Sequence, residues 1–308
     1  RELGLHNPGF VGGLGAVAAA GLMRGLSLDQ LCNAFGIAAA LLPVCPFVSF
    51  VEGADTKDLY GGWGVHLAMF AVDAAQRGLT GAEHVLDGIK SLNTVFQGDA
   101  GKEIALGEPY LINWLSIKQY PACFAVNPAV NAAFALQEKY NIDTAEIESV
   151  LVDSYPYSYD LNNGVGRDPN TTSGRLSLYY TVAVALIERS LTPDAFTAEK
   201  LKDPKYAELR GKITAKRHDA YGDGPKGIRA CILEVHMKDG RVYQTEYNAT
   251  DVHVVYSDEM LYEKYCGLTR DALAPDQQRD LYDYAMALAK QENLSYLLNM
   301  MRRLPKIR

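Results

Sequence analysis

The sequence lacks a strongly basic segment, a long uninterrupted apolar run and a CxxC pair. Its formal net charge is −7, so nucleic acid and anionic membrane surfaces are not expected as partners. No apolar run is long enough to span a bilayer, and the first residues lack the charged and apolar regions of a signal peptide. These absences favour a cytoplasmic protein that recognises a small molecule.

Cysteine is scarce and scattered, which argues against a disulfide framework. The chain has five widely spaced cysteines, namely Cys32, Cys45, Cys123, Cys231 and Cys266. No group of histidines and cysteines has the spacing of metal ligands. We therefore expect reduced, mostly buried thiols and no metal site.

Nucleotide and hydrolase motifs are missing as well. The glycine-rich segment 9–21 contains neither a GxGxxG after a strand nor a GK[ST]. No GxSxG elbow occurs either, so a serine hydrolase of that kind is excluded. The glycines here predict close helix packing instead of phosphate binding.

Hydrophobic residues are plentiful, at 48% of 308 positions, which predicts a sizeable core and two lobes. Small residues at 11–23 and a capping box of Ser27 with Gln30 indicate helices near the N-terminus. Alternation at 147–157 predicts a strand, and the apolar run 176–187 predicts a helix. Asp239-Gly240 between two alternating runs predicts a β-hairpin. Segment 276–298 has the pattern of a long amphipathic helix.

This order of elements predicts a mainly α-helical protein with an α+β lid. An all-helical domain is expected from both chain ends, residues 1–132 and 251–308. An inserted α+β domain is expected at 133–250, with the C-terminal helices packing back on the first lobe.

The most distinctive stretch is GADTKDLYGGWGVH at 53–66. Lys57 lies at or just before a helix start, where backbone N–H groups favour anions. Lys118 lies between helices, because Pro121 restricts the residue before it to an extended conformation. Two lysines at such junctions could clamp a dianionic acid, although an isolated lysine is more often a solvated surface residue.

Two further residues have side chains suited to acid–base work. His6 precedes a glycine-rich helix start and could remove a proton beside a carboxylate near neutral pH. Taken alone it is more often a capping or packing residue. Tyr180 could donate a hydrogen bond to a carboxylate, but its apolar surroundings favour a core position.

Four segments together resemble the MmgE/PrpD family, which includes 2-methylcitrate dehydratase, cis-aconitate decarboxylase and iminodisuccinate epimerase. They are GLHNPGFVGGLGAVAAAGLM, GADTKDLYGGWGVH, IKQYPACFAVNP and GRLSLYY. The resemblance implies a helical domain with an α+β lid, a homodimer, and catalysis without metal or organic cofactor. It also implies a di- or tricarboxylate substrate held between the two domains.

The resemblance gives His6, Lys57, Lys118 and Tyr180 catalytic roles and makes Lys57, Lys118, Tyr60 and Asn127 substrate contacts. The chemistry implied is proton removal next to a carboxylate, followed by loss of water or carbon dioxide, or by reprotonation on the other face.

Three positions depart from the family pattern. Pro8 replaces a threonine, while Tyr60 and Asn127 replace histidines. The usual N-terminal helical portion is also missing from the resemblance, so a separate helical chain as partner is one of the alternatives that stay open. Three readings follow: a lyase, an epimerase or isomerase in the same site, and a non-catalytic or partner-dependent subunit.

Overall fold

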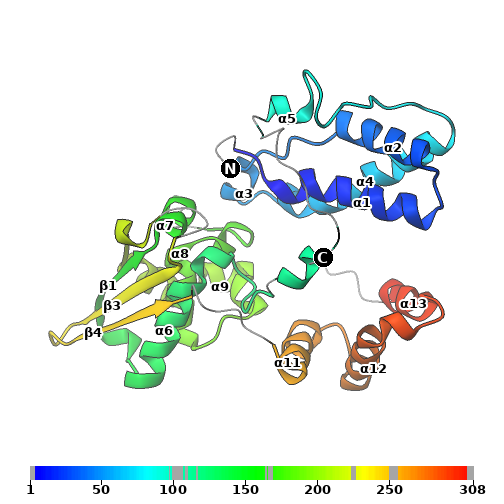
Figure 1. The fold of residues 1–308 in the computed structure, drawn as a ribbon. Helices are drawn as coiled ribbons and strands as arrows, with labels where there is room; N and C mark the ends of the chain where they lie inside the picture. The colour runs from blue at the N-terminus through cyan, green and yellow to red at the C-terminus, as the bar shows by residue number, and fades with distance from the viewer. Residues whose placement is uncertain are drawn as a thin grey trace.

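The computed structural model describes residues 4–96, 98, 107, 110–115, 117–163, 165, 169–222, 227–249 and 256–303. Three groups of elements are visible in Figure 1: the helices around α1, the sheet with its helices, and the last helices of the chain. The described chain is mainly helical with some β structure, as the sequence predicted, and its strands form one four-stranded mixed sheet. The strand at Ile213–Arg217 was not predicted from the sequence.

The first lobe is built from closely packed helices. Its elements are α1 (Asn7–Met23), α2 (Leu28–Ala40), α3 (Val48–Val51), α4 (Thr56–Gln76) and α5 (Leu92–Val95). A Cβ added at Gly64 of α4 would lie 2.9 Å from the carbonyl oxygen of Gly9 in α1. Glycine therefore lets the two backbones approach more closely than any side chain would permit.

Two predictions of local structure in this lobe are confirmed. The Ser27 and Gln30 capping box is present, with both reciprocal hydrogen bonds. Helix α4 begins at Thr56, so Lys57 lies in its first turn, as expected. The core of the lobe is made of small side chains, among them Val17, Ala38 and Ala71.

The sheet has strand order β2-β1-β3-β4. Its strands are β1 (Ile147–Ser154), β2 (Ile213–Arg217), β3 (Ala230–Met237) and β4 (Val242–Asn248). β1 pairs in parallel with β2 and antiparallel with β3, and β3 and β4 form the predicted hairpin. The expected strand 147–157 ends early, because Pro156 starts a helix at a position where its missing N–H costs nothing.

The sheet lobe carries the larger core. Its helices are α6 (Asn127–Tyr140), α7 (Pro156–Asn162), α8 (Leu178–Glu188), α9 (Ala198–Lys202) and α10 (Pro204–Gly211). Apolar residues of α6 and α8 share one buried cluster with the strands, including Leu136, Leu186 and Leu233. Helix α6 spans residue 132, where the sequence predicted a domain boundary, and its apolar residues pack against the strands of the sheet.

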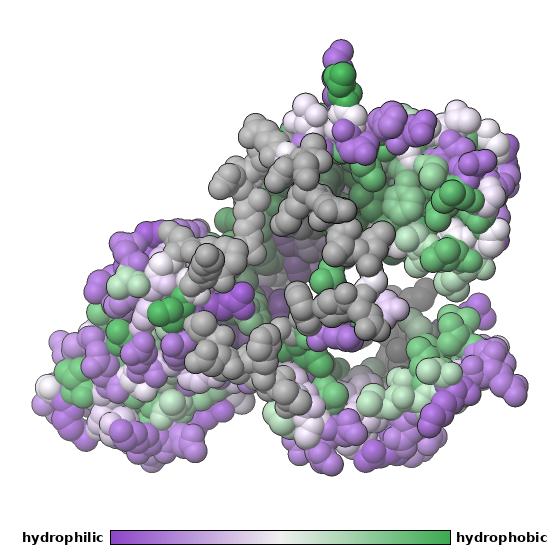
Figure 2. Space-filling view, viewed as in Figure 1, coloured by the Kyte–Doolittle hydropathy of each residue, from purple (hydrophilic) through white to green (hydrophobic). Residues whose placement is uncertain are grey.

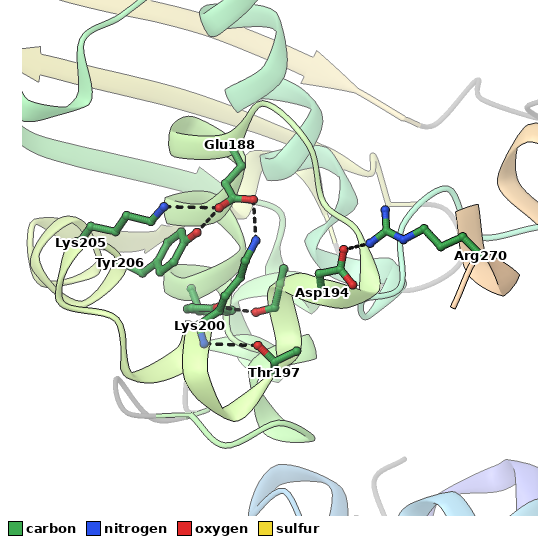
Figure 3. A network of polar contacts seen from close by, with 9 residues as sticks. Glu188, Asp194, Thr197, Lys200, Lys205, Tyr206 and Arg270 are labelled. Atoms are coloured by element: carbon green, nitrogen blue, oxygen red, sulfur yellow. Dashed lines mark hydrogen bonds and ion pairs between the residues drawn. The ribbon is translucent and has the colours of Figure 1, made fainter. Parts of the chain in front are cut away.

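The last helices are α11 (Asp258–Thr269), α12 (Pro275–Met286) and α13 (Ser295–Arg303). The single long helix expected at 276–298 is interrupted after Met286 by a short 3-10 turn and an extended Gln291. The side chain of Lys264 in α11 reaches the carbonyl oxygen of Lys118. Arg270, the residue after α11, pairs with Asp194 of the sheet lobe (Figure 3). Packing of these helices on the first lobe, and hence the two-domain division, stays a prediction.

The surfaces of the lobes differ in the view of Figure 2. Hydrophobic side chains gather on the visible face of the first lobe, whereas the visible outer surface of the sheet lobe is mostly hydrophilic (Figure 2). Trp63 and Phe70 of α4 remain 55% and 53% exposed. Even so, the helices that the structure describes include none with both the length and the apolar character to cross a membrane.

Candidate functional site

A cavity of about 780 Å³ lies where the first lobe faces the start of the sheet lobe. The first lobe contributes residues from the start of α1, from α3 and from the first turn of α4. The opposite wall comes from 118–124, from α7 and from 172–175. The cavity thus joins segments that are far apart in the sequence.

Four of the six predicted site residues line this cavity. They are His6, Lys57, Tyr60 and Lys118. The resemblance to a family had suggested this grouping, and the structure brings the four residues to one cavity. Their individual roles stay predictions.

His6 is held at the N-cap of α1 by its backbone. Its N–H donates to the carbonyl oxygen of Cys45 at 2.9 Å. The imidazole lies among the rings of Phe47, Phe50 and Tyr60, with centroid distances of 5.7, 5.3 and 5.6 Å. Its Nδ1 is buried and has no hydrogen-bond partner among the described residues.

This environment favours the neutral imidazole. Burial lowers the pKa of His6 below its ordinary value of 6.5, and the positive charge of Lys57 lowers this pKa further. A neutral imidazole is the form that accepts a proton, so the site holds His6 in the state that a general base requires.

Lys57 presents one cationic group to the cavity from the first turn of α4. Its Nζ donates to Oδ1 of Asp58 at 2.9 Å and lies 5.3 Å from the centre of the Phe50 ring. Asp58 is half-exposed, so it screens the lysine only in part. The ammonium group remains beside the cavity and next to a helix N-terminus, where an anion is favoured.

Lys118 presents a second cationic group from an irregular segment. Its Nζ donates to the carbonyl oxygen of Ala122 at 3.2 Å. Residues of α11 and of the segment before it hold the backbone here. Lys264 Nζ of α11 donates to the carbonyl oxygen of Lys118, and Tyr256 Oη, two residues before the helix, donates to that of Ile117 at 3.3 Å. Burial and the nearby charge of Lys118 lower the pKa of Lys264.

The other predicted residues differ in what they offer. The Tyr60 hydroxyl donates to the carbonyl oxygen of Pro46 at 3.1 Å, so the residue presents its ring to His6. Asn127 is buried as the first residue of α6 and does not line the cavity. Its Oδ1 has no partner among the described residues.

Tyr180 lies in the core and not on the cavity wall. It is fully buried in α8, and its hydroxyl donates to the carbonyl oxygen of Ala195. Burial raises the pKa of the Tyr180 hydroxyl, and the neighbouring side chains of Tyr206 and Glu188 raise this pKa further. The sequence left a core position open as the alternative, and this is where the structure places the side chain.

Arg175 is a cavity residue that sequence reasoning missed. It lines the cavity, and its carbonyl oxygen accepts a hydrogen bond from the N–H of Cys123 at 2.7 Å. That bond joins the segment after Lys118 to the start of α8. Arg175 lies within the GRLSLYY segment, so a search for cations in the resembling segments would have found it.

Two hydrogen bonds join the lobes beside the cavity. Asn170 Nδ2 donates to the carbonyl oxygen of Gly53 at 3.1 Å, and Thr172 Oγ1 donates to Oδ1 of Asp55 at 3.0 Å. Gly53 has φ of +74°, and a Cβ there would lie 2.3 Å from Asn170 Oδ1. Glycine is therefore required at this position both for its backbone conformation and for space.

The chemistry available in this cavity is acid–base and electrostatic. Within the ranges described, no group of His, Cys, Asp and Glu side chains is arranged to hold a metal ion. His6 shares the lining of this cavity with two lysines and an arginine, and Asp58 is the acidic residue of the lining. Such a set can bind carboxylates and remove a proton from a neighbouring carbon.

Comparison with known families agrees with the sequence resemblance. The MmgE/PrpD N-terminal domain profile matches residues 1–105, and the MmgE/PrpD C-terminal domain profile matches residues 120–290. A search of curated proteins found no match. Because these two matches cover most of the sequence, the chain belongs to the MmgE/PrpD family, whose members are generally dehydratases of small carboxylic acids.

Proposed function

We propose that the protein is a cofactor-independent lyase acting on a small di- or tricarboxylic acid. The observation that carries the proposal is one cavity whose lining residues include a histidine with a lowered pKa together with Lys57, Lys118 and Arg175. The cations bind the carboxylates, and the uncharged imidazole of His6 accepts the proton. Family membership supports the same class of reaction.

The proposed reaction consumes no second substrate. His6 takes the proton from the carbon next to a carboxylate, and the C–H electron pair moves onto that carbon. The cations stabilise the negative charge that spreads onto the carboxylate oxygens. In a dehydration this pair forms the C=C bond as the hydroxyl group leaves. The hydroxyl group takes the proton that His6 accepted and departs as water, which restores the neutral imidazole.

The direct test is incubation of candidate hydroxy-acids and unsaturated acids in deuterated water, followed by proton NMR. We expect loss of water or carbon dioxide together with deuterium incorporation at the carbon beside the carboxylate. A His6→Gln variant should lose both signals. Full activity in that variant would remove His6 from the mechanism.

The carboxylate clamp has its own test. Replacement of Lys57 or Lys118 by Ala removes a charged hydrogen bond, which is worth about 1.5–3 kcal/mol, or roughly 10–150-fold in affinity. Calorimetry with succinate and citrate measures this loss, and Lys202→Ala, an exposed position in α9, is the matched control. Wild-type affinity in both cavity variants would count decisively against the clamp.

An epimerase or isomerase of a dicarboxylate is the second candidate. Two positions where the family commonly has histidine hold Tyr60, whose hydroxyl is engaged by Pro46, and Asn127, which does not line the cavity. Fewer acids are then available to protonate a leaving hydroxyl. Deuterium exchange without elimination in the same NMR experiment favours this candidate.

Assembly belongs to the proposal as well. Members of the family are commonly oligomeric, and we propose a homodimer with no metal or organic cofactor. A partner-dependent subunit is the third candidate. Purification that brings down a separate helical polypeptide required for activity would favour it, whereas an active homodimer would exclude it.

A further inference from the structure

One asparagine side chain makes hydrogen bonds on both sides of the cavity without lining it. Asn170 belongs to the segment before α8, and its amide reaches Gly53, which lies shortly before α4. Neither of these two residues is on the cavity wall, whereas Lys57 and Arg175, a few positions further along the same two segments, both are. The Asn170 side chain is therefore placed to fix two cationic residues relative to each other.

On its own side of the cavity, the amide oxygen of Asn170 closes a turn. Oδ1 accepts from the N–H groups of Thr172 at 3.0 Å and Ser173 at 2.8 Å, and from the Ser173 hydroxyl at 3.1 Å. The backbone of Asn170 takes part as well, because its carbonyl oxygen accepts from the N–H of Gly174 at 2.7 Å. An asparagine side chain bonded to the backbone in this way stabilises a turn, and this turn leads directly into Arg175.

On the other side, the amide nitrogen of Asn170 holds the first lobe. Nδ2 donates to the carbonyl oxygen of Gly53 at 3.1 Å, and Gly53 is buried. The N–H of Gly53 in turn donates to the carbonyl oxygen of Phe50 at 3.1 Å. The centre of the Phe50 ring lies 5.3 Å from that of His6 and 5.3 Å from Nζ of Lys57. The residue that Asn170 binds is thus joined to the segment that holds the proposed base and the first cation.

The two ends of this amide cannot exchange their partners. Backbone N–H groups have to meet the oxygen, and a backbone carbonyl has to meet the nitrogen. Aspartate would supply the oxygen for the turn but would place a second acceptor against Gly53. Serine would supply a hydroxyl for the turn and no group that reaches the first lobe. Asparagine meets both sets of partners at once.

We propose that Asn170 is a positioning residue, which holds Lys57 on the first lobe in alignment with Arg175 so that one acid meets both cations. This inference rests on the proposed function, because it assumes a carboxylate ligand in the cavity. Asn170 acts through the backbones of 53–57 and 170–175 and does not touch the ligand. A ligand with two carboxylates depends on this alignment, whereas a ligand with one carboxylate needs only one of the cations.

Asn170→Asp in the intact protein separates the two ends of the amide. The turn keeps its acceptor, while the buried carbonyl oxygen of Gly53 loses its donor and faces a second oxygen. Loss of a hydrogen bond at a buried acceptor changes an equilibrium constant by about fivefold or more. Calorimetry should therefore show the Kd for succinate rising by about that factor. The Kd for butyrate, which has one carboxylate, should change little in an NMR titration.

Asn299→Asp is the matched control, because it adds the same charge at an exposed position of α13. We expect the Kd values for succinate and butyrate to stay at their wild-type levels in this variant. If Asn170→Asp does not fold, Asn170→Ser takes its place. Its hydroxyl still accepts from the N–H groups of the turn, and it has no donor that reaches Gly53.

A double-mutant cycle with Lys57→Ala gives a result that a general loss of stability would not produce. Without the first-lobe cation, the alignment of that lobe no longer contributes to binding of a diacid. In the Lys57→Ala background, Asn170→Asp should therefore change the succinate Kd by less than about twofold. Equal changes with and without the Lys57 side chain overturn the positioning role.

The outcomes separate this inference from the function on which it rests. Wild-type affinity for succinate in Asn170→Asp, or equal losses for succinate and butyrate, overturns the role of Asn170 and leaves the carboxylate site standing. No binding of succinate or citrate by the wild-type protein overturns both the positioning role and the proposed function.

Discussion

The first lobe and the sheet lobe bury their apolar residues in different ways. The sheet lobe encloses large side chains completely, among them Leu136, Tyr180 and Leu186, each 1% exposed or less. The first lobe encloses mainly alanine and valine and leaves Leu22 and Trp63 more than half exposed. Because stabilisation grows with the apolar area removed from water, we expect the sheet lobe to be the more stable half.

The two lobes also differ in the residues that they contribute to the cavity. The first lobe supplies His6 and Lys57 from the ends of two helices, while the sheet side supplies Arg175 from the turn before the buried α8. Hydrogen bonds from Asn170 and Thr172 fasten the first lobe to that side. The two hydrogen bonds therefore tie the helix starts that carry His6 and Lys57 to the side that carries Arg175.

The largest effect is expected from the sheet-lobe core. Leu186→Ala removes a fully buried side chain and leaves a cavity, which should cost about 2–5 kcal/mol of unfolding free energy. Leu22→Ala, at a position that is 71% exposed in α1, should cost far less. Urea unfolding of both variants measures the contrast, and equal losses would refute the difference in stability between the lobes.

The junction of the lobes should give the next effect. Gly53→Ala introduces a Cβ into Asn170 as well as strain at positive φ, which itself costs about 1–2 kcal/mol. Gly25→Ala is the matched control, because φ is +66° there and no atom lies within 4 Å of the new Cβ. We expect both to lose stability but only Gly53→Ala to weaken dicarboxylate binding in calorimetry.

Support of Lys118 by α11 should produce a smaller change. Lys264→Met removes the donor to the carbonyl oxygen of Lys118, a loss of about 1 kcal/mol or roughly fivefold in KM. We expect kcat to change little, because the substitution displaces a carboxylate-binding group and spares the base. Lys290→Met, at an exposed position after α12, provides the comparison, and an equal effect there would contradict the role of α11.

The smallest effect is expected from the titration of His6. Because its folded-state pKa lies below 6.5, the unfolded chain binds more protons near and below that pH. The associated stability is fully present above pH 6.5 and is lost as the pH falls. Thermal unfolding from pH 7.5 to 5 should show a steeper loss in the wild type than in His6→Gln.

Much of the local structure was predictable because it depends on a few neighbouring residues. The capping box at Ser27 and the hairpin at Asp239-Gly240 each follow from short-range hydrogen bonding and turn geometry. The helix start next to Lys57 was also expected, although its N-cap residue Asp55 makes no side-chain capping hydrogen bond. The long helix expected at 276–298 was wrong in its continuity, since periodicity alone did not reveal the extended Gln291. Local sequence patterns thus predicted whether a segment is a helix or a strand better than they predicted the residues at which it begins and ends.

The cavity was predictable only in part. His6, Lys57 and Lys118 were named from residue type and family resemblance, whereas Arg175 was passed over and Tyr180 was placed in the core by the fold. A tyrosine in an apolar helix has the same local pattern whether its hydroxyl meets a ligand or a buried carbonyl oxygen. The group that the hydroxyl meets in the folded chain decides its role, and a local sequence pattern does not reveal that group.

By itself, the sequence determined the mainly helical composition, the hairpin, and a chain with cations suited to an acid. Only the tertiary structure decided which of those cations share a cavity, that aromatic rings surround His6, and that α6 packs with the sheet. The physical reason is the separation along the sequence of the residues that interact. Caps and turns are closed by residues a few positions apart, whereas a cavity is closed by packing between segments that only the whole fold brings together.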